Sequence, residues 1–507
     1  MLLELHCHSS RHSKCSAAEP QDLIKQAIKK DLHGLIFTEH GYLWCKEEIE
    51  ELRKQYGIDR HFLLLSAQEV DTDFGHVVVY GADKSLQGKY KVSDIRALYP
   101  DAALVWAHPL RKGAQPSDEK FTDKNIDAVE IFSLNHTIKE NYLGLKTWHR
   151  LKFTAVCASD AHSADKAGAF PALFDHPVAS IEETALEIKR GRCRPFYKET
   201  MLSGSRATVT EVVIGTKGQP EQRERIIIKK SEDDKTWKEA KNTALVIKDR
   251  LSANFADKNY RIPLIYEIDD SIRAIMEEGQ RGQQLSKLLS HVGAASREKY
   301  FKLAAKWLAK LHSYKIKPNV NDNAAEQTEN KRLKRYKQRF EENKTKHSAL
   351  ISYLIENIAK KENEIYFKRP QDFIFLHGDY HPGNIIIGQD DSKDPDSSFV
   401  SVIDFNNSIN FVKEFDAGYF LAQYQSQFSD EKELLDSLTQ DLFLKTYFDA
   451  QSVSQKELND AMFFKLRAYL SIASFFHSMG MGESQKMDFI AADIEKTLSE
   501  TKNVFEI

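Results

Sequence analysis

The sequence lacks the features of several protein classes. None of its apolar runs approaches the roughly 18–20 residues that cross a bilayer, so we expect no membrane partner. Neither sign of charge is in large excess, because the sequence has 72 Lys and Arg and 75 Asp and Glu, which gives a net charge of −3. That balance argues against a whole-surface grip on nucleic acid, which would need a local basic patch. Small phosphorylated molecules are therefore the favoured ligands.

Cysteine is scarce and unpaired in the sequence. There are five cysteines, an odd number, and no C-x-x-C motif, which argues against a disulfide framework or a structural zinc knot. The first residues, Met1–His6, have neither the charged segment nor the long apolar segment of a secretion signal. We therefore expect a cytoplasmic protein whose first strand begins at once.

The 507 residues predict two to four domains, at roughly 100–200 residues per domain. Up to residue 195, short β-branched runs alternate with amphipathic stretches, which indicates an α/β fold with mostly parallel strands. We expect strands at 2–6, 34–38, 62–66, 76–81, 103–107, 128–132 and 153–158, and helices at 19–31, 46–56, 137–150 and 181–190. The first domain is predicted to span 1–199.

From residue 200 the pattern changes. Strands are expected at 206–215 and 225–230, a helix at 236–252, and two more strand-like runs within 262–278. The remainder is mainly helical, except for strand runs at 384–388 and 399–405. A small sheet lobe followed by a large helical lobe is the outline of an α+β bilobal domain, predicted to span 200–507.

Histidine is concentrated in the first domain, which holds 12 of the 18. Histidine is the commonest transition-metal ligand in proteins. Five apolar segments carry candidate ligands near their carboxyl ends, where α/β folds gather functional residues: His6 with His8, Glu39 with His40, Glu69, His108, and Asp160 with His162.

Imidazoles and carboxylates without clustered cysteines suit zinc, manganese or iron. Two such metals can activate a water and stabilise both oxygens of an in-line displacement at phosphorus. The pattern therefore predicts a metal-dependent hydrolase of phosphate esters.

These motifs resemble the PHP family, named for polymerase and histidinol phosphatase. The matches are Leu-His6-Cys-His8-Ser, Thr-Glu39-His40, Gln-Glu69-Val, Gly75-His76, Ala-His108-Pro109 and Ser-Asp160-Ala-His162, in the family's order over about residues 1–195. The resemblance implies a distorted β/α barrel with two or three metals that hydrolyses phosphomonoesters or phosphodiesters. The ligands that it implies are His6, His8, His40, Glu69, His108, His136, Asp160 and His162.

The sequence departs from this family at two places. Arg11-His12-Ser13-Lys14-Cys15 follows the first motif where the family often has Ser-Asp-Gly, and Glu39 stands where Asp is usual. The number of metals therefore stays open, as do ligand roles for His12, Cys15 and His76.

A second group of candidate catalytic and metal-binding residues lies between His377 and Phe405. Kinase-type phosphoryl transfer needs a base near the acceptor hydroxyl, and an Asn and an Asp on Mg²⁺. The spacing His377-x-Asp379-x-x-x-x-Asn384, followed by the strand-borne Asp404-Phe405, supplies these groups. Asp379 is the predicted base, and Asn384 and Asp404 are the predicted Mg²⁺ ligands.

With Gly378 inside the motif and His381-Pro-Gly-Asn384 after it, this segment resembles the aminoglycoside phosphotransferase family, which includes choline and homoserine kinase-like enzymes. The resemblance covers about 203–480, with Asp416 and the helix Trp307–Ser313 as further matches. It implies ATP- and Mg²⁺-dependent phosphorylation of a small-molecule hydroxyl. It leaves the acceptor open, because the acceptor pocket belongs to the variable helical lobe.

Residues for the nucleotide are less distinct. Lys229 is the first choice for the phosphate-binding lysine, with Lys230 as the alternative, because strand alternation turns only one of them inward. The further candidates are Glu239 as the partner of that lysine, Ser203, Gly204 and Ser205 as a short phosphate loop, and Glu277 at the hinge beside adenine.

The two halves together predict a bifunctional enzyme, a phosphoesterase joined to a small-molecule kinase. One alternative is a kinase and phosphatase for nucleic-acid ends, which only the basic helix at 331–339 supports; a solvated helix face is the other interpretation of that helix. Another alternative is a phosphoesterase regulated by a nucleotide-sensing, kinase-like domain.

Overall fold

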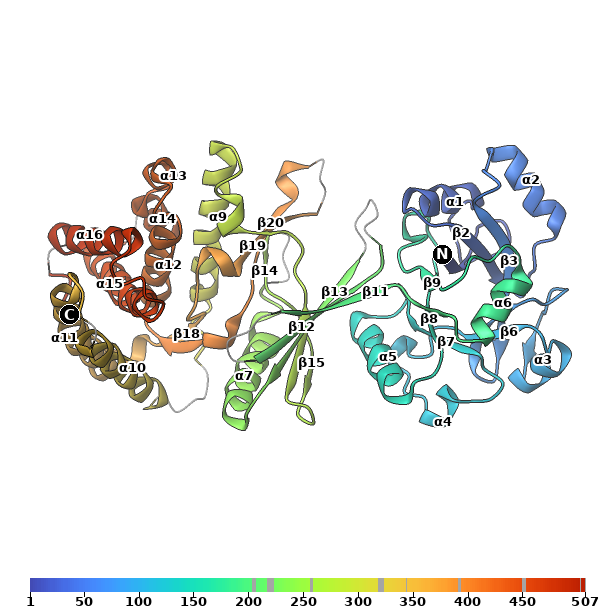
Figure 1. Ribbon diagram of the computed structural model, residues 1–507, viewed down its shortest axis with the longest axis horizontal. Helices are drawn as coiled ribbons and strands as arrows, with labels where there is room; N and C mark the ends of the chain where they lie inside the picture. Colours follow the sequence, from blue (N-terminus) through green and yellow to red (C-terminus); the bar gives the residue numbers. More distant parts are fainter. Residues whose placement is uncertain are drawn as a thin grey trace. The chain divides into compact units, whose positions relative to one another are not determined.

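The computed structural model describes residues 1–202, 207–216, 223–255, 259–317, 323–342, 344–390, 394–448, 453–501 and 503–506, without the side chains of 323–330 and 395. It divides into two compact units (Figure 1). The first comprises Met1–Glu232 and Tyr266–Gly279, and the second comprises Asp233–Ile265 and Gln280–Ile507.

A ten-stranded sheet forms the centre of the first unit, in the order β10-β9-β1-β2-β3-β4-β6-β7-β8, with β5 beside β3. Its strands are β1 (Leu2–Cys7), β2 (Gly34–His40), β3 (Leu63–Thr72), β4 (Gly75–Tyr80), β5 (Lys89–Tyr90), β6 (Ala103–Trp106), β7 (Ala128–Phe132), β8 (Ala155–Cys157), β9 (Ala172–Phe174) and β10 (Cys193–Pro195). The seven strands expected in this region are all present, and α/β architecture is confirmed.

The expectation of a mostly parallel sheet holds only for two runs, β1-β2-β3 and β6-β7-β8. β4 is antiparallel to both β3 and β6, and β9 is antiparallel to β1 and β10. The reason lies in the chain: β3 extends to Thr72, and only two residues separate it from Gly75. A two-residue connection joins antiparallel neighbours, whereas a parallel pair needs a crossover.

The sheet curls into a nearly closed barrel. β8 and β10, at the two ends of the strand order, contact each other. Cys7 at the end of β1 also bridges Ala161 in parallel, and the His8 backbone N–H donates to the Ala161 carbonyl at 2.9 Å. The segment that follows β8 is therefore held against the carboxyl end of β1.

Helices lie around this sheet (Figure 1): α1 (Pro20–Lys29), α2 (Lys46–Tyr56), α3 (Val92–Leu98), α4 (Asp118–Phe121), α5 (Ile138–Leu151) and α6 (Ile181–Lys189). Strand alternation on β2 separates two cores. Leu35 and Phe37 pack with Leu23 of α1 and Leu52 of α2, whereas Ile36 belongs to a different cluster, with Leu3, Leu5, Val78 and Val105 of other strands. Both sides of the sheet are therefore buried.

The first unit also contains a smaller sheet in the order β11-β12-β13-β16-β15. Its strands are β11 (Tyr197–Leu202), β12 (Ala207–Ile214), β13 (Glu224–Ser231), β15 (Ile265–Asp269, whose first residue belongs to the second unit) and β16 (Ala274–Glu278). Val212, Ile214 and Ile226 share one core with Phe132 and Tyr142 of the barrel. The compact units therefore do not divide at residue 199, which falls inside β11, and a functional boundary there stays a prediction.

The second unit is mainly helical. Its helices are α7 (Asp234–Val246, continued by a π turn at Ile247–Leu251), α8 (Leu285–Leu288), α9 (Ala294–Ser313), α10 (Asn323–Glu342), α11 (Ser348–Lys368), α12 (Glu414–Gln427), α13 (Lys432–Ser437), α14 (Gln440–Tyr447), α15 (Gln455–Ser478) and α16 (Gln485–Glu500). In the described part of the chain, none of the helices has the length and apolar character needed to cross a membrane.

Two small sheets accompany these helices. One has the order β14-β20-β19-β17, and the other pairs β18 with β21. Their strands are β14 (Tyr260–Arg261), β17 (Gln283–Gln284), β18 (Ile374–Leu376), β19 (Ile385–Gln389), β20 (Ser398–Val402) and β21 (Ile409–Phe411). β19 and β20 pair antiparallel and match the strand runs expected at 384–388 and 399–405. β18 and β19 flank the segment from His377 to Asn384.

Candidate functional sites

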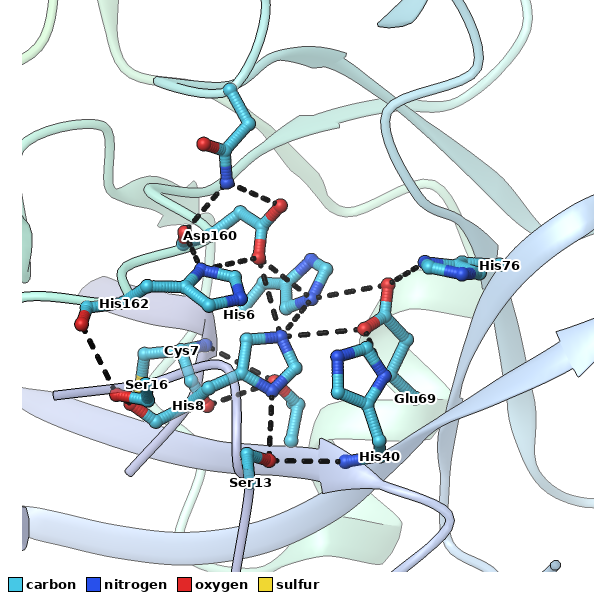
Figure 2. Close-up of polar contacts among 12 residues, drawn as sticks. His6, Cys7, His8, Ser13, Ser16, His40, Glu69, His76, Asp160 and His162 are labelled. Atoms are coloured by element: carbon cyan, nitrogen blue, oxygen red, sulfur yellow. Dashed lines mark hydrogen bonds and ion pairs between the residues drawn. The ribbon is translucent and has the colours of Figure 1, made fainter. Parts of the chain in front are cut away.

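Six imidazoles and two carboxylates come together at one end of the barrel strands, and His76 reaches them from the start of the antiparallel β4; Figure 2 labels all of these residues except His108. Their possible ligand atoms form three groups, each within 4.8 Å: His8, His40 and His162; His6, His8 and Asp160; and Glu69, His76 and His108. We call these eight residues the histidine cluster. It unites seven of the eight predicted ligands, and His76, whose role the sequence left open, joins them.

Glu69 lies within 3.5 Å of five imidazoles, those of His6, His8, His40, His76 and His108, and Figure 2 labels the first four. Its Oε1 is 2.8 Å from Nδ1 of His76 and 3.1 Å from Nε2 of His108. Its Oε2 is 3.0 Å from Nδ1 of His40 and 3.3 Å from Nε2 of His8. Burial alone would raise the pKa of Glu69, but the charge of His6 and the hydrogen bonds from neighbouring imidazoles bring that pKa well below its usual range. The carboxylate is therefore ionised.

Asp160 lies beside His6 and His8, both of which also lie near Glu69. Its Oδ1 is 3.2 Å from Nε2 of His8 and 3.4 Å from Nε2 of His6. Its Oδ2 accepts a hydrogen bond from Asn135 at 2.7 Å. Burial opposes the charge on Asp160, but His6 and His8 lower its pKa below the usual range. The φ angle of Asp160 is +47°, and such backbone conformations in residues other than glycine concentrate at functional sites.

A layer of polar residues surrounds the cluster. Glu130 of β7 is 99% buried and lies 2.9 Å from Nδ1 of His6, so it can fix the imidazole with Nε2 turned toward Asp160. Glu39 accepts hydrogen bonds from the hydroxyls of Ser9 and Ser13 and from the Trp44 indole. Sequence reasoning missed Glu130 as a functional residue, although an acid inside the apolar run Val-Glu-Ile-Phe was the indication.

Three further candidates lie outside the three ligand groups formed by the described residues. His136 is buried, its Nδ1 lies 3.1 Å from Oδ1 of Asn141, and its Nε2 has no hydrogen-bond partner. Burial lowers its pKa, which favours the neutral form that binds metals. His12 instead pairs with Glu48 at 3.1 Å and stacks on Tyr42, and Cys15 is an exposed free thiol.

The cluster fits a set of divalent metals. The Nε2 atoms of His6 and His8 are only 3.1 Å apart, and the buried Oδ1 of Asp160 and Nε2 of His136 have no hydrogen-bond partner. A cation would satisfy such converging lone pairs. The nitrogen and oxygen donors suit zinc, manganese or iron, and the presence of these metals stays a prediction.

The second site is the loop after β18 in the second unit, which carries Asp379. The amide of Asn407 donates to Oδ2 of Asp379 at 3.1 Å, and the amide of Asn384 donates to the Asp379 backbone carbonyl at 3.0 Å. Asp404 follows β20 with φ +65°, and its Oδ1 accepts a 2.6 Å hydrogen bond from Asn406. Nδ2 of Asn384 is thus fixed against the loop. Asp379 is only half-buried.

Asp416 of α12 anchors this loop. Its two carboxylate oxygens each accept a 2.9 Å hydrogen bond, one from the His377 backbone N–H and one from the Gly378 N–H. His312 of α9 lies 3.1 Å from the same carboxylate, and both side chains are buried. Gly378 has φ +79°, and a Cβ there would stand 1.9 Å from the Asn407 carbonyl, so only glycine fits.

The nucleotide candidates are distributed over both units. Lys229 of β13 forms an ion pair with Glu277 of the neighbouring β16 at 2.7 Å, and Lys230 is exposed. Glu239 lies exposed on α7 of the second unit. Ser203, Gly204 and Ser205 lie outside the described residues. The preference for Lys229 as the half-buried lysine agrees with strand alternation, and its role stays a prediction.

Comparison with known families finds a match for one part of the chain. Residues 261–451 match the model of the phosphotransferase enzyme family, and this range includes Asp379, Asn384, Asp404 and Asp416. The C-terminal part of the chain is therefore a kinase-like phosphotransferase domain. An uncharacterised protein of Methanocaldococcus jannaschii is 23% identical over 123 residues, which are 24% of this chain and 70% of that protein.

Several solved structures are similar to this chain over about 60% of its length. An ethanolamine kinase of Plasmodium vivax is 16% identical, with a TM-score of 0.39, over 60% of this chain and 81% of that one. An amicoumacin kinase in complex with AMP-PNP and Ca²⁺ is 16% identical, with a TM-score of 0.40, over 60% and 88%. An ADP-bound aminoglycoside phosphotransferase is 16% identical, with a TM-score of 0.36, over 61% and 94%.

Proposed function

We propose that the chain is a bifunctional enzyme, a metal-dependent phosphate-ester hydrolase joined to an ATP-dependent kinase of a small-molecule hydroxyl. The convergence of Glu69 and Asp160 with six imidazoles carries the hydrolase half. The family match around Asp379 and the hydrogen bonds that position it support the kinase half.

In the hydrolase half, the histidine cluster and His136 would hold two or three zinc, manganese or iron ions. When bound, such ions supply an activated water and neutralise charge on the phosphate oxygens. The protein's own residues keep the site ready for this. Glu130 orients His6, Asn135 turns Asp160, and burial keeps Glu69 away from bulk water. A phosphomonoester or phosphodiester is the proposed substrate class.

In the kinase half, Asp379 accepts the proton of the acceptor hydroxyl as its oxygen attacks the γ-phosphorus of ATP. Asn384 and Asp404 are the proposed Mg²⁺ ligands, which fits their amide and carboxylate oxygens. Asp416 is a positioning residue, because it holds the backbone on the N-terminal side of Asp379. Lys229 and Glu277 are proposed contacts of the nucleotide.

Two substitutions test the assignment. Asp160→Asn removes a charged candidate ligand and should abolish hydrolysis of p-nitrophenyl phosphate or bis-p-nitrophenyl phosphate while sparing phosphorylation with ATP. Asp379→Asn removes the base and should lower phosphorylation by about 10²–10⁴-fold while sparing hydrolysis. Exposed Asp101→Asn and Asp441→Asn are matched controls.

Metal content by mass spectrometry and ADP release across an acceptor panel complete the experiment. Hydrolysis that survives in Asp160→Asn with full metal content would contradict the hydrolase half. ATP binding without turnover on any acceptor would instead favour a nucleotide sensor.

A further inference from the structure

A cavity of about 450 Å³ lies in the helical part of the second unit. α12 contributes Tyr419, Gln423 and Gln427 to its lining, α15 contributes Ser471 and Phe475, and α16 contributes Lys486. All three helices belong to the second unit, as does Asp379.

The cavity adjoins the proposed base. Burial raises the pKa of the Tyr419 hydroxyl, and so does the neighbouring carboxylate of Asp379. The amide of Gln423 donates to the same hydroxyl at 3.1 Å. Gln427, at the C-terminal end of α12, contacts the Asp379 loop at His381, where its Nε2 lies 3.4 Å from Nδ1 of His381. A molecule in the cavity would therefore contact Tyr419 and Gln427, the two lining residues that adjoin the Asp379 loop.

The chemistry of the lining is selective. It offers hydroxyls, amides, two phenylalanine rings and one cation, and no Asp or Glu is among the described residues that line it. A polycationic acceptor loses hydration on entering such a cavity and needs carboxylates in exchange. This lining supplies hydrogen bonds to a neutral body and one positive charge instead.

Lys486 is available to an anion. It forms a loose ion pair with Asp430, with Nζ and Oδ2 3.9 Å apart and the two side chains 40% and 76% exposed, and such a surface pair contributes little. Asp488, two residues further along α16, pairs with Lys346 and His347. The phenyl ring of Phe475 is 58% exposed at the same cavity and offers an apolar face.

The basic helix α10 flanks the same region. The hydroxyl of Tyr336 lies 2.9 Å from Oγ of Ser471, a cavity residue, and Arg339 donates to the Ser474 carbonyl at 2.9 Å. Lys331, Lys334, Arg335 and Lys337 are exposed on this helix, and Glu341 faces Lys337 at 4.0 Å. The surplus positive charge favours approach of an anion within a Debye length of about 8 Å.

We propose that the acceptor of the kinase is an anionic hydroxy compound with a flat, apolar body. Its carboxylate or phosphate binds Lys486, its ring packs on Phe475, and its hydroxyl faces Asp379. The hydroxyl oxygen bonds to the γ-phosphorus, its proton passes to Asp379, and the bond between that phosphorus and the bridging oxygen of ADP breaks. The proposal rests on the proposed kinase function and specifies its acceptor.

A matched acceptor series tests the charge. para-Hydroxymethyl benzoate, benzamide and benzylamine share one hydroxyl and one ring and differ in charge. With the full chain and ATP, we expect kcat/KM to be about 10-fold higher for the benzoate than for the benzylamine, as one charge-assisted contact predicts. A preference for the benzylamine would overturn the proposal.

Two variants locate the contact. Lys486→Glu should raise KM for the benzoate about 10-fold, leave kcat nearly unchanged, and remove the discrimination against the benzylamine. Lys496→Glu, an exposed lysine on the same helix and outside the cavity lining, is the control. An unchanged KM in Lys486→Glu would show that the anion is bound elsewhere and overturn the proposal.

The outcomes separate the two claims. Phosphorylation of neutral or cationic acceptors alone, insensitive to Lys486, would overturn the anionic acceptor and leave the kinase intact. Failure to phosphorylate any acceptor of any charge, with intact ATP binding, would contradict the kinase function itself and the acceptor with it.

Discussion

The histidine cluster and the Asp379 loop are both rich in histidine and carboxylate side chains, yet the polar atoms of the two regions find different partners. In the cluster, candidate ligands face one another, with Nε2 of His6 and His8 3.1 Å apart and both beside Asp160. In the loop, the groups that position Asp379 are matched by partners inside the protein, such as the two N–H groups on Asp416. The converging nitrogen and oxygen atoms of the cluster are an arrangement that a cation would satisfy. The matched hydrogen-bond pairs of the loop, in contrast, already fix its geometry.

This difference predicts what each region depends on. The cluster should depend on metal and on the residues that aim its imidazoles, because buried polar atoms without partners are costly. The loop should depend on its internal hydrogen bonds and keep its geometry without a ligand. Substitutions that remove one internal partner in each region therefore test the comparison.

The largest effect is expected for Asp416→Asn in the loop. An amide cannot accept hydrogen bonds from both the His377 and Gly378 N–H groups and also pair with His312. A shift of the order of 1 Å in a catalytic group can cost about 10²-fold. We expect kcat for phosphorylation to fall by about 10²-fold, KM for ATP to change little, and hydrolysis to stay unchanged.

The control is Asp441→Asn, whose carboxylate forms an exposed pair with Lys445. Steady-state kinetics with ATP as the varied substrate separates kcat from KM. A kcat within about two-fold of the unmodified protein would mean that the loop holds its geometry without Asp416. The claim that the loop depends on its internal hydrogen bonds would then be wrong.

The residue types of the histidine cluster and their order could be predicted from sequence, because motifs such as His6-Cys-His8 and Asp160-Ala-His162 are local; their role as metal ligands stays a prediction. Strand periodicity also located β1, β2 and β7. The anchor between His312 and Asp416 spans 104 residues and exists only after α9 and α12 have packed. Glu130 was read as part of a strand, because its partner His6 lies 124 residues away. Contacts between distant segments leave no local pattern.

An intermediate effect is expected for Glu130→Gln in the barrel. Glutamine preserves the size and one hydrogen bond to Nδ1 of His6, but it removes the charge that strengthens that imidazole as a ligand. Replacing such outer partners costs about 10–100-fold in metal affinity, and we expect the lower end. Competition with a chelator, followed by mass spectrometry of the retained metal, measures the change.

Phosphorylation should be unaffected in Glu130→Gln, and Glu119→Gln on the exposed side of α4 is the control. Unchanged metal affinity would indicate that the geometry of His6 is fixed by other contacts, so that the cluster resembles the loop more closely than proposed.

The smallest effect is expected for Ser13→Ala. This variant tests whether the metal affinity of the cluster also depends on a hydroxyl in the surrounding layer. The Ser13 hydroxyl donates to Glu39 and lies 3.4 Å from Nδ1 of His8. Glu39 keeps its hydrogen bonds from Ser9 and Trp44, so the variant leaves no buried carboxylate without a donor. The contact between the Ser13 hydroxyl and Nδ1 of His8 is a long hydrogen bond between uncharged groups when His8 is a neutral ligand, and such a bond contributes about 0.5–1.5 kcal/mol at most. We expect metal affinity to fall about two-fold in the same chelator competition. A loss of metal affinity as large as that of Glu130→Gln would mean that Ser13 orients His8 as strongly as Glu130 orients His6.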